Sequence, residues 1–252
     1  MRIHLQSDAH LELGVPNVST VASDVCVLAG DIGAMSTINQ QAALEQFFEE
    51  RKSLAEHVIW VLGNHEFYGM QYEDALAEAH RIAKRCGVHL LDEAIGTDNL
   101  EIDGVKFWGS TLWSDLRGND CFVNKRVADN INDFHVIRHG VRNFSTHKMI
   151  EINRRTRDKI NWDADVIITH FAPVLFSNPR FPTDEISYYF YNSGLDNQIL
   201  DSSVKLWLFG HTHHSLVEDL NGTIVASNQH GYRRSPGWFE DTGYQSNFIL
   251  EV

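Results

Sequence analysis

Five apolar runs of strand length lie along the chain, and each is followed closely by aspartate, asparagine or histidine. Continuous apolar runs, without alternation of apolar and polar positions, are typical of strands buried in a parallel sheet. The carboxyl ends of parallel strands meet at one edge of a sheet, where ligands of open α/β sheets bind. We therefore predict one polar cluster at the ends of the runs Arg2 to Ser7, Asp24 to Ala29, His57 to Leu62, Asp165 to Thr169 and Val204 to Phe209.

Two helices are predicted between the early strands. Residues 37–56 place apolar side chains at helical spacing, and residues 72–86 form a second helical stretch that ends at Gly87. Strands that alternate with helices in this way indicate right-handed βαβ units and a parallel core.

The rest of the chain predicts shorter elements. These are strands at 88–91 and within 100–113 with a turn at Asp103-Gly104, a helix at 195–201, a hairpin through Asn221-Gly222 and a last strand at 247–252. Residues 177–194 form a loop with Pro179, Pro182 and the aromatic run Tyr188 to Tyr191. Together the elements predict an α/β fold, with one mixed sheet or two packed sheets covered by helices. We interpret residues 1–252 as a single domain with a mostly helical insertion at about 114–162.

The charge balance narrows the possible partners. The chain has 21 lysines and arginines against 34 aspartates and glutamates, which gives a net charge of −13. This surface disfavours long nucleic acid, which requires many cationic contacts, but it is compatible with small phosphorylated substrates. The sequence has no apolar stretch long enough to span a membrane. Because the first strand begins near residue 2, we expect no signal peptide and a cytoplasmic location; the sequence predicts no oligomeric state.

The polar residues at the strand ends have the chemistry of a metal site. Carboxylate, amide and imidazole ligands suit manganese, iron or zinc ions, and the three cysteines are too widely spaced for a thiolate site. The donors are too many for one tetrahedral zinc ion with an open position, whereas two ions would use them all. Because two-metal sites support in-line displacement at phosphorus, we predict phosphoester hydrolysis at Asp8, His10, Asp31, Asn64, His65, His170, His211 and His213.

The strand ends carry five short motifs: Asp8-x-His10, Gly30-Asp31, Gly63-Asn64-His65-Glu66, His170 and Gly210-His211-x-His213. In this order they resemble the five motifs of the calcineurin-like metallophosphoesterases. Each motif alone is common, but the set is specific, and it extends from the first strand to near the end of the chain. The resemblance implies two mixed β-sheets packed face to face with helices outside, a four-layer α/β/β/α sandwich.

The resemblance also implies two divalent or mixed-valence ions (Mn, Fe or Zn) that share Asp31. It assigns the first ion to Asp8, His10, Asp31 and His213. It assigns the second ion to Asp31, Asn64, His170 and His211. The implied catalytic residues are Asp31, which bridges the ions, and His65, which acts beside the substrate. A hydroxide that bridges the ions is implied as the nucleophile, without a covalent enzyme intermediate.

Two positions depart from the pattern of the family. Glu66 stands where many members have aspartate, and Phe171 stands where some have a second histidine. We expect Glu66 to support the metal ligands indirectly and Phe171 to shape the substrate pocket. The segment Asn132-Asp133-Phe134 looks like one found in bacterial relatives, which favours a role on the substrate side.

A small phosphodiester is the predicted substrate, because a compact acidic chain is poorly suited to long nucleic acid. The alternatives are a phosphomonoesterase acting on small phosphorylated metabolites or phosphoproteins, a catalytically silent metal-binding scaffold, and a metal-dependent hydrolase of another bond, such as an amide. The predicted substrate contacts are Tyr189, whose ring would stack on a base or sugar, and the cations Arg126 and Arg138.

Overall fold

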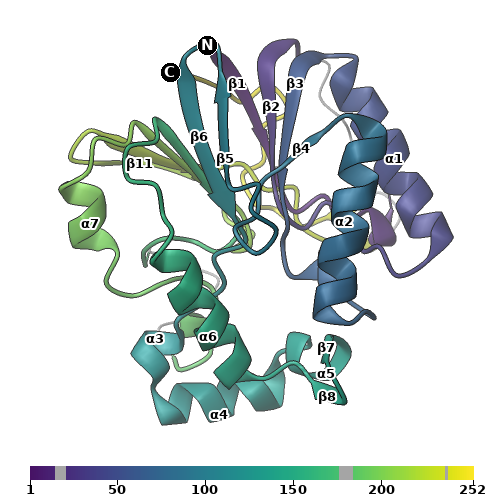
Figure 1. Ribbon diagram of the computed structural model, residues 1–252, viewed down its shortest axis with the longest axis vertical. Helices are drawn as coiled ribbons and strands as arrows, with labels where there is room; N and C mark the ends of the chain where they lie inside the picture. The colour runs from purple at the N-terminus through teal and green to yellow at the C-terminus, as the bar shows by residue number, and fades with distance from the viewer. Residues whose placement is uncertain (15–20, 176–183, 236–237) are drawn as a thin grey trace.

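Two mixed β-sheets pack face to face, and helices cover their outer faces (Figure 1). The computed structural model describes residues 1–14, 21–175, 184–235 and 238–252. The first sheet has the strand order β15-β1-β2-β3-β4, and the second has the order β11-β12-β10-β9-β6-β5. The predicted α/β fold with two packed mixed sheets flanked by helices is therefore confirmed.

The strands of the first sheet are β1 (Arg2–Gln6), β2 (Ser23–Ala29), β3 (Ala55–Val61), β4 (His89–Leu90) and β15 (Ile249–Glu251). Those of the second are β5 (Asn99–Ile102), β6 (Val105–Ser110), β9 (Val166–Thr169), β10 (Leu206–Phe209), β11 (Leu216–Leu220) and β12 (Thr223–Ser227). Two short ribbons, absent from the sequence prediction, pair β7 (Arg138–His139) with β8 (Arg142–Asn143) and β13 (Arg233–Ser235) with β14 (Trp238–Phe239).

The central strands of each sheet are parallel. In the first sheet β15 runs antiparallel to β1, and in the second β5 and β11 are the antiparallel edge strands. Buried aliphatic side chains fill the space between the sheets, each contributing roughly 1.5–3 kcal/mol by its burial; among them are Leu5, Val27, Ile59, Ile168 and Leu208. The parallel arrangement directs the carboxyl ends of β1, β2, β3, β9 and β10 toward one end of the sandwich (Figure 1).

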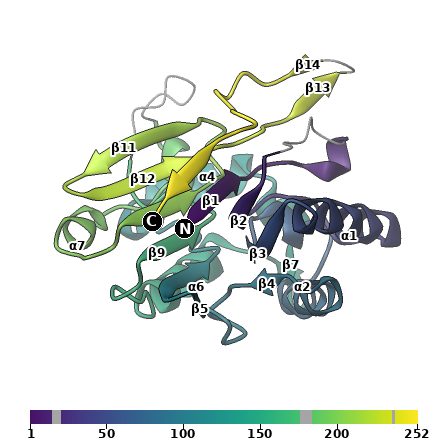
Figure 2. The ribbon, with the colours of Figure 1, turned by 90° about the horizontal axis from the view of Figure 1, so that it is seen from above.

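Helices α1 (Ile38–Lys52) and α2 (Tyr72–Cys86) lie on the outer side of the first sheet (Figure 2). Thr37 starts α1 with a capping box, in which its side chain and that of Gln40 each accept a backbone N–H of the other residue. The predicted end of this helix is wrong, because the chain leaves the helix after Lys52 and pairs with β2 from Ala55 onward.

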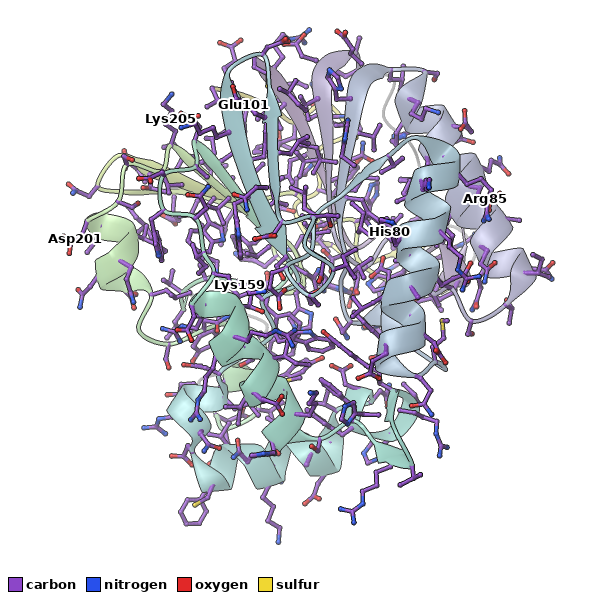
Figure 3. The ribbon with its side chains drawn as sticks, in the orientation of Figure 1. His80, Arg85, Glu101, Lys159, Asp201 and Lys205 are labelled. Atoms are coloured by element: carbon purple, nitrogen blue, oxygen red, sulfur yellow. The ribbon has the colours of Figure 1, made fainter. Side chains whose placement is uncertain are left out.

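The bounds predicted for α2 agree with the structure, and the left-handed Gly87 (φ 66°) caps its end. The apolar face of α2 packs toward the first sheet. His80 and Arg85 lie on its exposed face (Figure 3).

Residues 114–162 lie beyond the carboxyl ends of the strands (Figure 1). They contain β7, β8 and the helices α3 (Leu116–Asn119), α4 (Cys121–Asn130), α5 (Asp133–Val136) and α6 (Thr146–Arg157). We refer to residues 114–162 as the helical segment.

In the predicted 177–194 loop, the structure describes residues 184–194, with a 3-10 turn at Ser187–Tyr189; Pro179 and Pro182 lie outside the described residues. The short helix α7 (Asp196–Leu200) follows, as predicted. None of the helices formed by the described residues has the length and apolarity needed to cross a bilayer.

Candidate functional site

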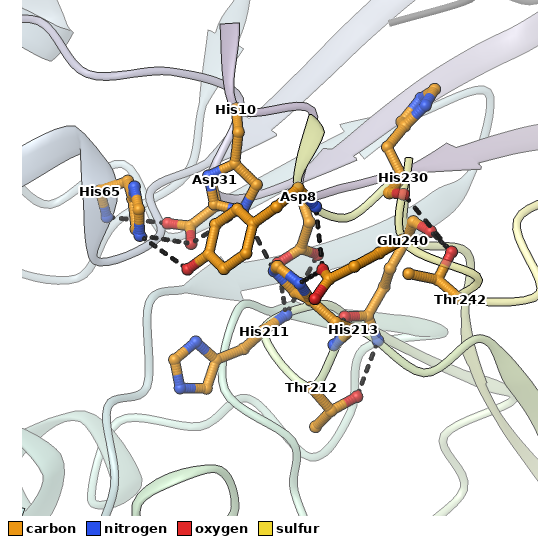
Figure 4. Close-up of polar contacts among 12 residues, drawn as sticks. Asp8, His10, Asp31, His65, His211, Thr212, His213, His230, Glu240 and Thr242 are labelled. Atoms are coloured by element: carbon orange, nitrogen blue, oxygen red, sulfur yellow. Dashed lines mark hydrogen bonds and ion pairs between the residues drawn. The ribbon is translucent and has the colours of Figure 1, made fainter. Parts of the chain in front are cut away.

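Five strand ends bring the predicted polar residues together. Figure 4 shows six of them, Asp8, His10, Asp31, His65, His211 and His213. Each side chain projects from the loop that directly follows a buried strand, so the sheet fixes its position. The contributions are Asp8 and His10 after β1, Asp31 after β2, Asn64 and His65 after β3, His170 after β9, and His211 and His213 after β10. All of these residues except the partly exposed His65 are buried.

Five of these residues adopt left-handed backbone conformations. The φ angles are 54° at Asp8, 46° at His10, 51° at Asp31, 72° at His211 and 48° at His213. Such conformations are uncommon for residues other than glycine and cost of order 1–3 kcal/mol each. They turn the chain sharply at the strand ends, and their concentration here is typical of a functional site.

Two glycines allow the loops to approach one another closely. A Cβ atom at Gly63 would lie 2.1 Å from Asp31 Oδ1, and one at Gly30 would lie 2.4 Å from His170 Nδ1. No side chain fits at either position without displacing a predicted metal ligand. The glycines of the Gly30-Asp31 and Gly63-Asn64 motifs therefore provide space for the cluster.

The first group of donors consists of Asp8, His10 and His213, whose ligand atoms lie within 4.8 Å of one another. His10 Nε2 is 3.1 Å from His213 Nε2, and His213 Nε2 is 3.4 Å from Asp8 Oδ1. Asp31 Oδ2 lies 3.9 Å from His10 Nε2. Three of the four residues expected around the first ion therefore form one group, and the fourth, Asp31, lies next to its His10.

The second group consists of Asp31, His170 and His211, again within 4.8 Å. His170 Nε2 lies 3.4 Å from Asp31 Oδ1 and 3.1 Å from Asn64 Oδ1. His211 Nε2 is buried and has no hydrogen-bond partner among the described residues. Because a buried polar atom without a partner is costly, this free imidazole nitrogen fits a metal ligand.

The carboxylates of the cluster stabilise positive charge at two of its histidines, His170 and His213. Burial disfavours the charged form of His170, but the Asp31 carboxylate outweighs burial and raises the pKa of His170 to about 9. Burial also opposes the charged form of His213, but the carboxylates of Asp8 and Glu240 raise its pKa to about 9. Carboxylates that stabilise buried imidazolium also stabilise a metal cation at the same place.

Two carboxylates that the sequence analysis missed contact the Nδ1 atoms of three histidines of the cluster. Glu12 Oε1 lies 2.8 Å from His65 Nδ1 and 3.4 Å from His10 Nδ1. Glu240 Oε2 lies 2.6 Å from His213 Nδ1. Each carboxylate leaves the Nε2 atom directed into the cluster, as metal-binding histidines require. Glu12 lies two residues after His10, but the position of Glu240 gave no comparable signal in the sequence.

Replacing Glu240 by glutamine is expected to weaken the binding of one Mn²⁺ ion by about 10–100-fold. The neutral amide has nearly the same size and its oxygen can still accept from Nδ1, but without the negative charge it makes His213 a weaker metal ligand. Calorimetric titration with Mn²⁺ measures the effect. Glu218→Gln is the control, because Glu218 is exposed on β11. Equal affinities for the two variants would show that the charge of Glu240 does not strengthen His213 as a metal ligand.

The two departures from the family pattern have different surroundings. The Glu66 carboxylate is buried and accepts the backbone N–H groups of Asp31 (3.0 Å), Ile32 (2.8 Å) and Gly63 (2.8 Å). It therefore joins the loop after β2 to the loop after β3. The ring of Phe171 packs on that of His211, with 3.9 Å between the centroids.

A pocket of about 450 Å³ opens onto the cluster. The helical segment contributes Asn130, Ile131 and Asn132 to its wall. The other lining residues are Asp31, Asn64, His65, Tyr68, Tyr189, Phe190, His211, His213, Tyr232, Arg234 and Glu240.

Only one of the three predicted substrate contacts lines this pocket. Tyr189 does, but Arg126 and Arg138 are exposed on α4 and β7 and do not belong to its described lining. The arginine that does line it is Arg234, which the sequence analysis did not select. A role for Arg126 or Arg138 in binding the substrate has no support from this geometry.

Comparison with known proteins identifies the family to which the chain belongs. Residues 6–215 match the family model of the calcineurin-like phosphoesterases. An uncharacterized protein of Acanthamoeba polyphaga mimivirus is 27% identical over 239 residues, covering 86% of this chain and 81% of the viral protein. The crystal structure of the phosphopantetheinyl hydrolase from Mycobacterium tuberculosis shares the fold, with a TM-score of 0.69, 16% identity and coverage of 94% of both chains. The chain described here belongs to the calcineurin-like phosphoesterase family.

Proposed function

We propose that this protein is a two-metal-dependent phosphoester hydrolase that acts on a small phosphodiester. The observation that carries the proposal is the pair of buried donor groups beside the pocket, with Asp31 in the second group and its Oδ2 atom 3.9 Å from His10 Nε2 of the first. Asp8, His10, Asp31 and His213 would hold one ion, and Asp31, Asn64, His170 and His211 the other. When bound, paired ions polarise the phosphoryl oxygens and generate a nucleophile from water near neutral pH.

His65 is the residue placed to act on the substrate. Its side chain is 12% exposed, and its Nε2 atom lies 3.9 Å from Asp31 Oδ2 and 3.4 Å from the hydroxyl of Tyr232. Glu12 holds Nδ1, and the ring of Tyr68 stacks on the imidazole with 4.1 Å between the centroids. Held in this way, His65 can present a proton from Nε2 to the oxygen that leaves phosphorus.

The walls of the pocket support a small organic ester. Aromatic and apolar side chains line it together with the amides of Asn130 and Asn132, while Arg234 is the one arginine or lysine in its described lining. One arginine is too little for a long polyanion. The phosphopantetheinyl hydrolase with a related fold supports a small phosphorylated substrate. The preference between diester and monoester is measured by the following experiment.

The test is the specificity constant for bis(p-nitrophenyl) phosphate compared with that for p-nitrophenyl phosphate, both with added Mn²⁺. We expect the diester to be preferred and a chelator to abolish the activity. A monoester preference would replace the proposal with a phosphomonoesterase. A protein that binds two ions but hydrolyses neither ester would favour the metal-binding scaffold, or an amide hydrolase if amides are cleaved.

A further inference from the structure

A buried carboxylate from the helical segment contacts three side chains that line the pocket. Asp133 lies at the start of α5 and is fully buried. Its Oδ1 atom accepts hydrogen bonds from Asn64 Nδ2 (2.9 Å) and the hydroxyl of Tyr68 (2.8 Å). Its Oδ2 atom accepts one from the hydroxyl of Tyr189 (2.5 Å). All three donors belong to other parts of the chain.

The first of these hydrogen bonds fixes the orientation of the Asn64 amide. An asparagine side chain has one end that donates and one that accepts, and only the oxygen end can bind a cation. A carboxylate accepts hydrogen bonds but does not donate them, so Asp133 selects the NH₂ end. The amide oxygen is consequently directed toward His170 Nε2, 3.1 Å away, within the second donor group.

The other two hydrogen bonds hold aromatic walls of the site. The ring of Tyr68 stacks on His65, and the ring of Tyr189 meets His211 edge to face with 4.9 Å between the centroids. Both rings contact the imidazole of a predicted site residue, and both tyrosines donate to the same carboxylate. A single residue of the helical segment thus reaches the surroundings of Asn64, His65 and His211.

We propose that Asp133 is a positioning residue of the metal centre, which holds the Asn64 amide oxygen toward the second ion and the Tyr68 and Tyr189 rings against the histidines. This inference rests on the proposed function, which assigns Asn64 to that ion. In this proposal the helical segment both lines the pocket and helps to position the metal ligands. A buried carboxylate with only a structural role would affect stability but not one ion selectively.

The test is a titration of the full-length apoprotein with Co²⁺, followed by calorimetry and by the visible absorption of the bound ions. In Asp133→Asn the new side chain has one acceptor end, which cannot serve three donors. We expect the affinity for one Co²⁺ to fall by about 10–100-fold, as for other residues that orient a metal ligand, while the other ion binds as in the wild type. The absorption change should be confined to the weakened ion.

Three further variants make the outcome decisive. Asn64→Ala should weaken the same ion, and Asp129→Asn, an exposed change on α4, should weaken neither. The exchange Asn64→Asp with Asp133→Asn restores a donor–acceptor pair with the roles reversed, so it should recover most of the lost affinity. The exchange also provides the folded sample if Asp133→Asn alone does not fold.

The outcomes separate this inference from the function on which it rests. Loss of one ion in Asn64→Ala, with both ions retained in Asp133→Asn, would overturn the positioning role and leave the two-metal proposal standing. Where Asp133→Asn alone does not yield folded protein, the double variant Asn64→Asp with Asp133→Asn decides. If the double variant binds one ion as weakly as Asn64→Ala does, the positioning role of Asp133 is overturned. Wild-type protein that binds fewer than two ions would overturn the proposed function itself.

Discussion

Replacing Asp31 by asparagine is expected to lower kcat by roughly 10³-fold or more, which corresponds to a barrier increase of about 4 kcal/mol. Asp31 belongs to the second donor group and lies 3.9 Å from His10 of the first, so losing its charge should weaken both proposed metal sites at once. The fold should be retained, because asparagine tolerates the left-handed conformation of this residue (φ 51°) and its oxygen can still accept the His65 N–H. The measurement is kcat on the better of the two nitrophenyl esters.

Circular dichroism and the melting temperature of the apoprotein show whether the variant is folded. Asp163→Asn is the matched control, because it makes the same chemical change at an exposed loop position outside the pocket. Turnover by a folded Asp31→Asn variant within tenfold of the wild type would contradict the two-metal mechanism.

The positions of the strands could be predicted because strands that are buried on both faces have continuous apolar sequences. Runs such as Val25 to Ala29 have no exposed face, so they remain apolar at every position and stop where the sheet ends. The residues that follow such runs are then close in space, even though Asp8 and His213 are separated by more than 200 positions in sequence. This reasoning placed the whole polar cluster without knowledge of any contact.

The supporting residues could not be predicted in the same way. Glu240 and Asp133 do not follow buried strands, and their contacts depend on how distant loops pack. Asp133 was selected only through the resemblance of the Asn132-Asp133-Phe134 segment, without the contacts that it makes. In the sequence, an acidic residue within a polar stretch looks the same whether its side chain is exposed to solvent or buried against a histidine or an asparagine. For the same reason the sequence analysis chose Arg126 and Arg138 as substrate contacts, although both are exposed. It did not choose Arg234, which lines the pocket.

The end of α1 shows a further limit of sequence patterns. Residues 53–56 continue the helical spacing of apolar positions, but Ala55 and Glu56 begin the strand that pairs with β2. Local spacing does not include the free energy of pairing with a distant strand, and here the pairing determined the structure. Errors of this kind shift an element's boundary and leave the strand ends, and therefore the site, in place.

Replacing His65 by asparagine is expected to lower kcat by about 10²–10⁴-fold, the usual contribution of a positioned acid or base. The shorter amide can keep a hydrogen bond with Glu12, which lies 2.8 Å from Nδ1, but it lacks the Nε2 edge that faces Asp31 and Tyr232. Both ions should therefore remain bound. Steady-state kinetics and metal analysis of the same sample measure the two properties separately.

The leaving group distinguishes the two possible roles of His65. If His65 protonates the leaving oxygen, its loss should reduce the hydrolysis of an alkyl ester far more than that of a nitrophenyl ester, because nitrophenolate leaves without a proton. If His65 instead stabilises charge on the phosphoryl oxygens, both esters should lose activity equally. His135→Asn, an exposed change on α5, should leave both rates unchanged. A His65→Asn variant that keeps both ions and loses less than tenfold in kcat on both esters would exclude both roles.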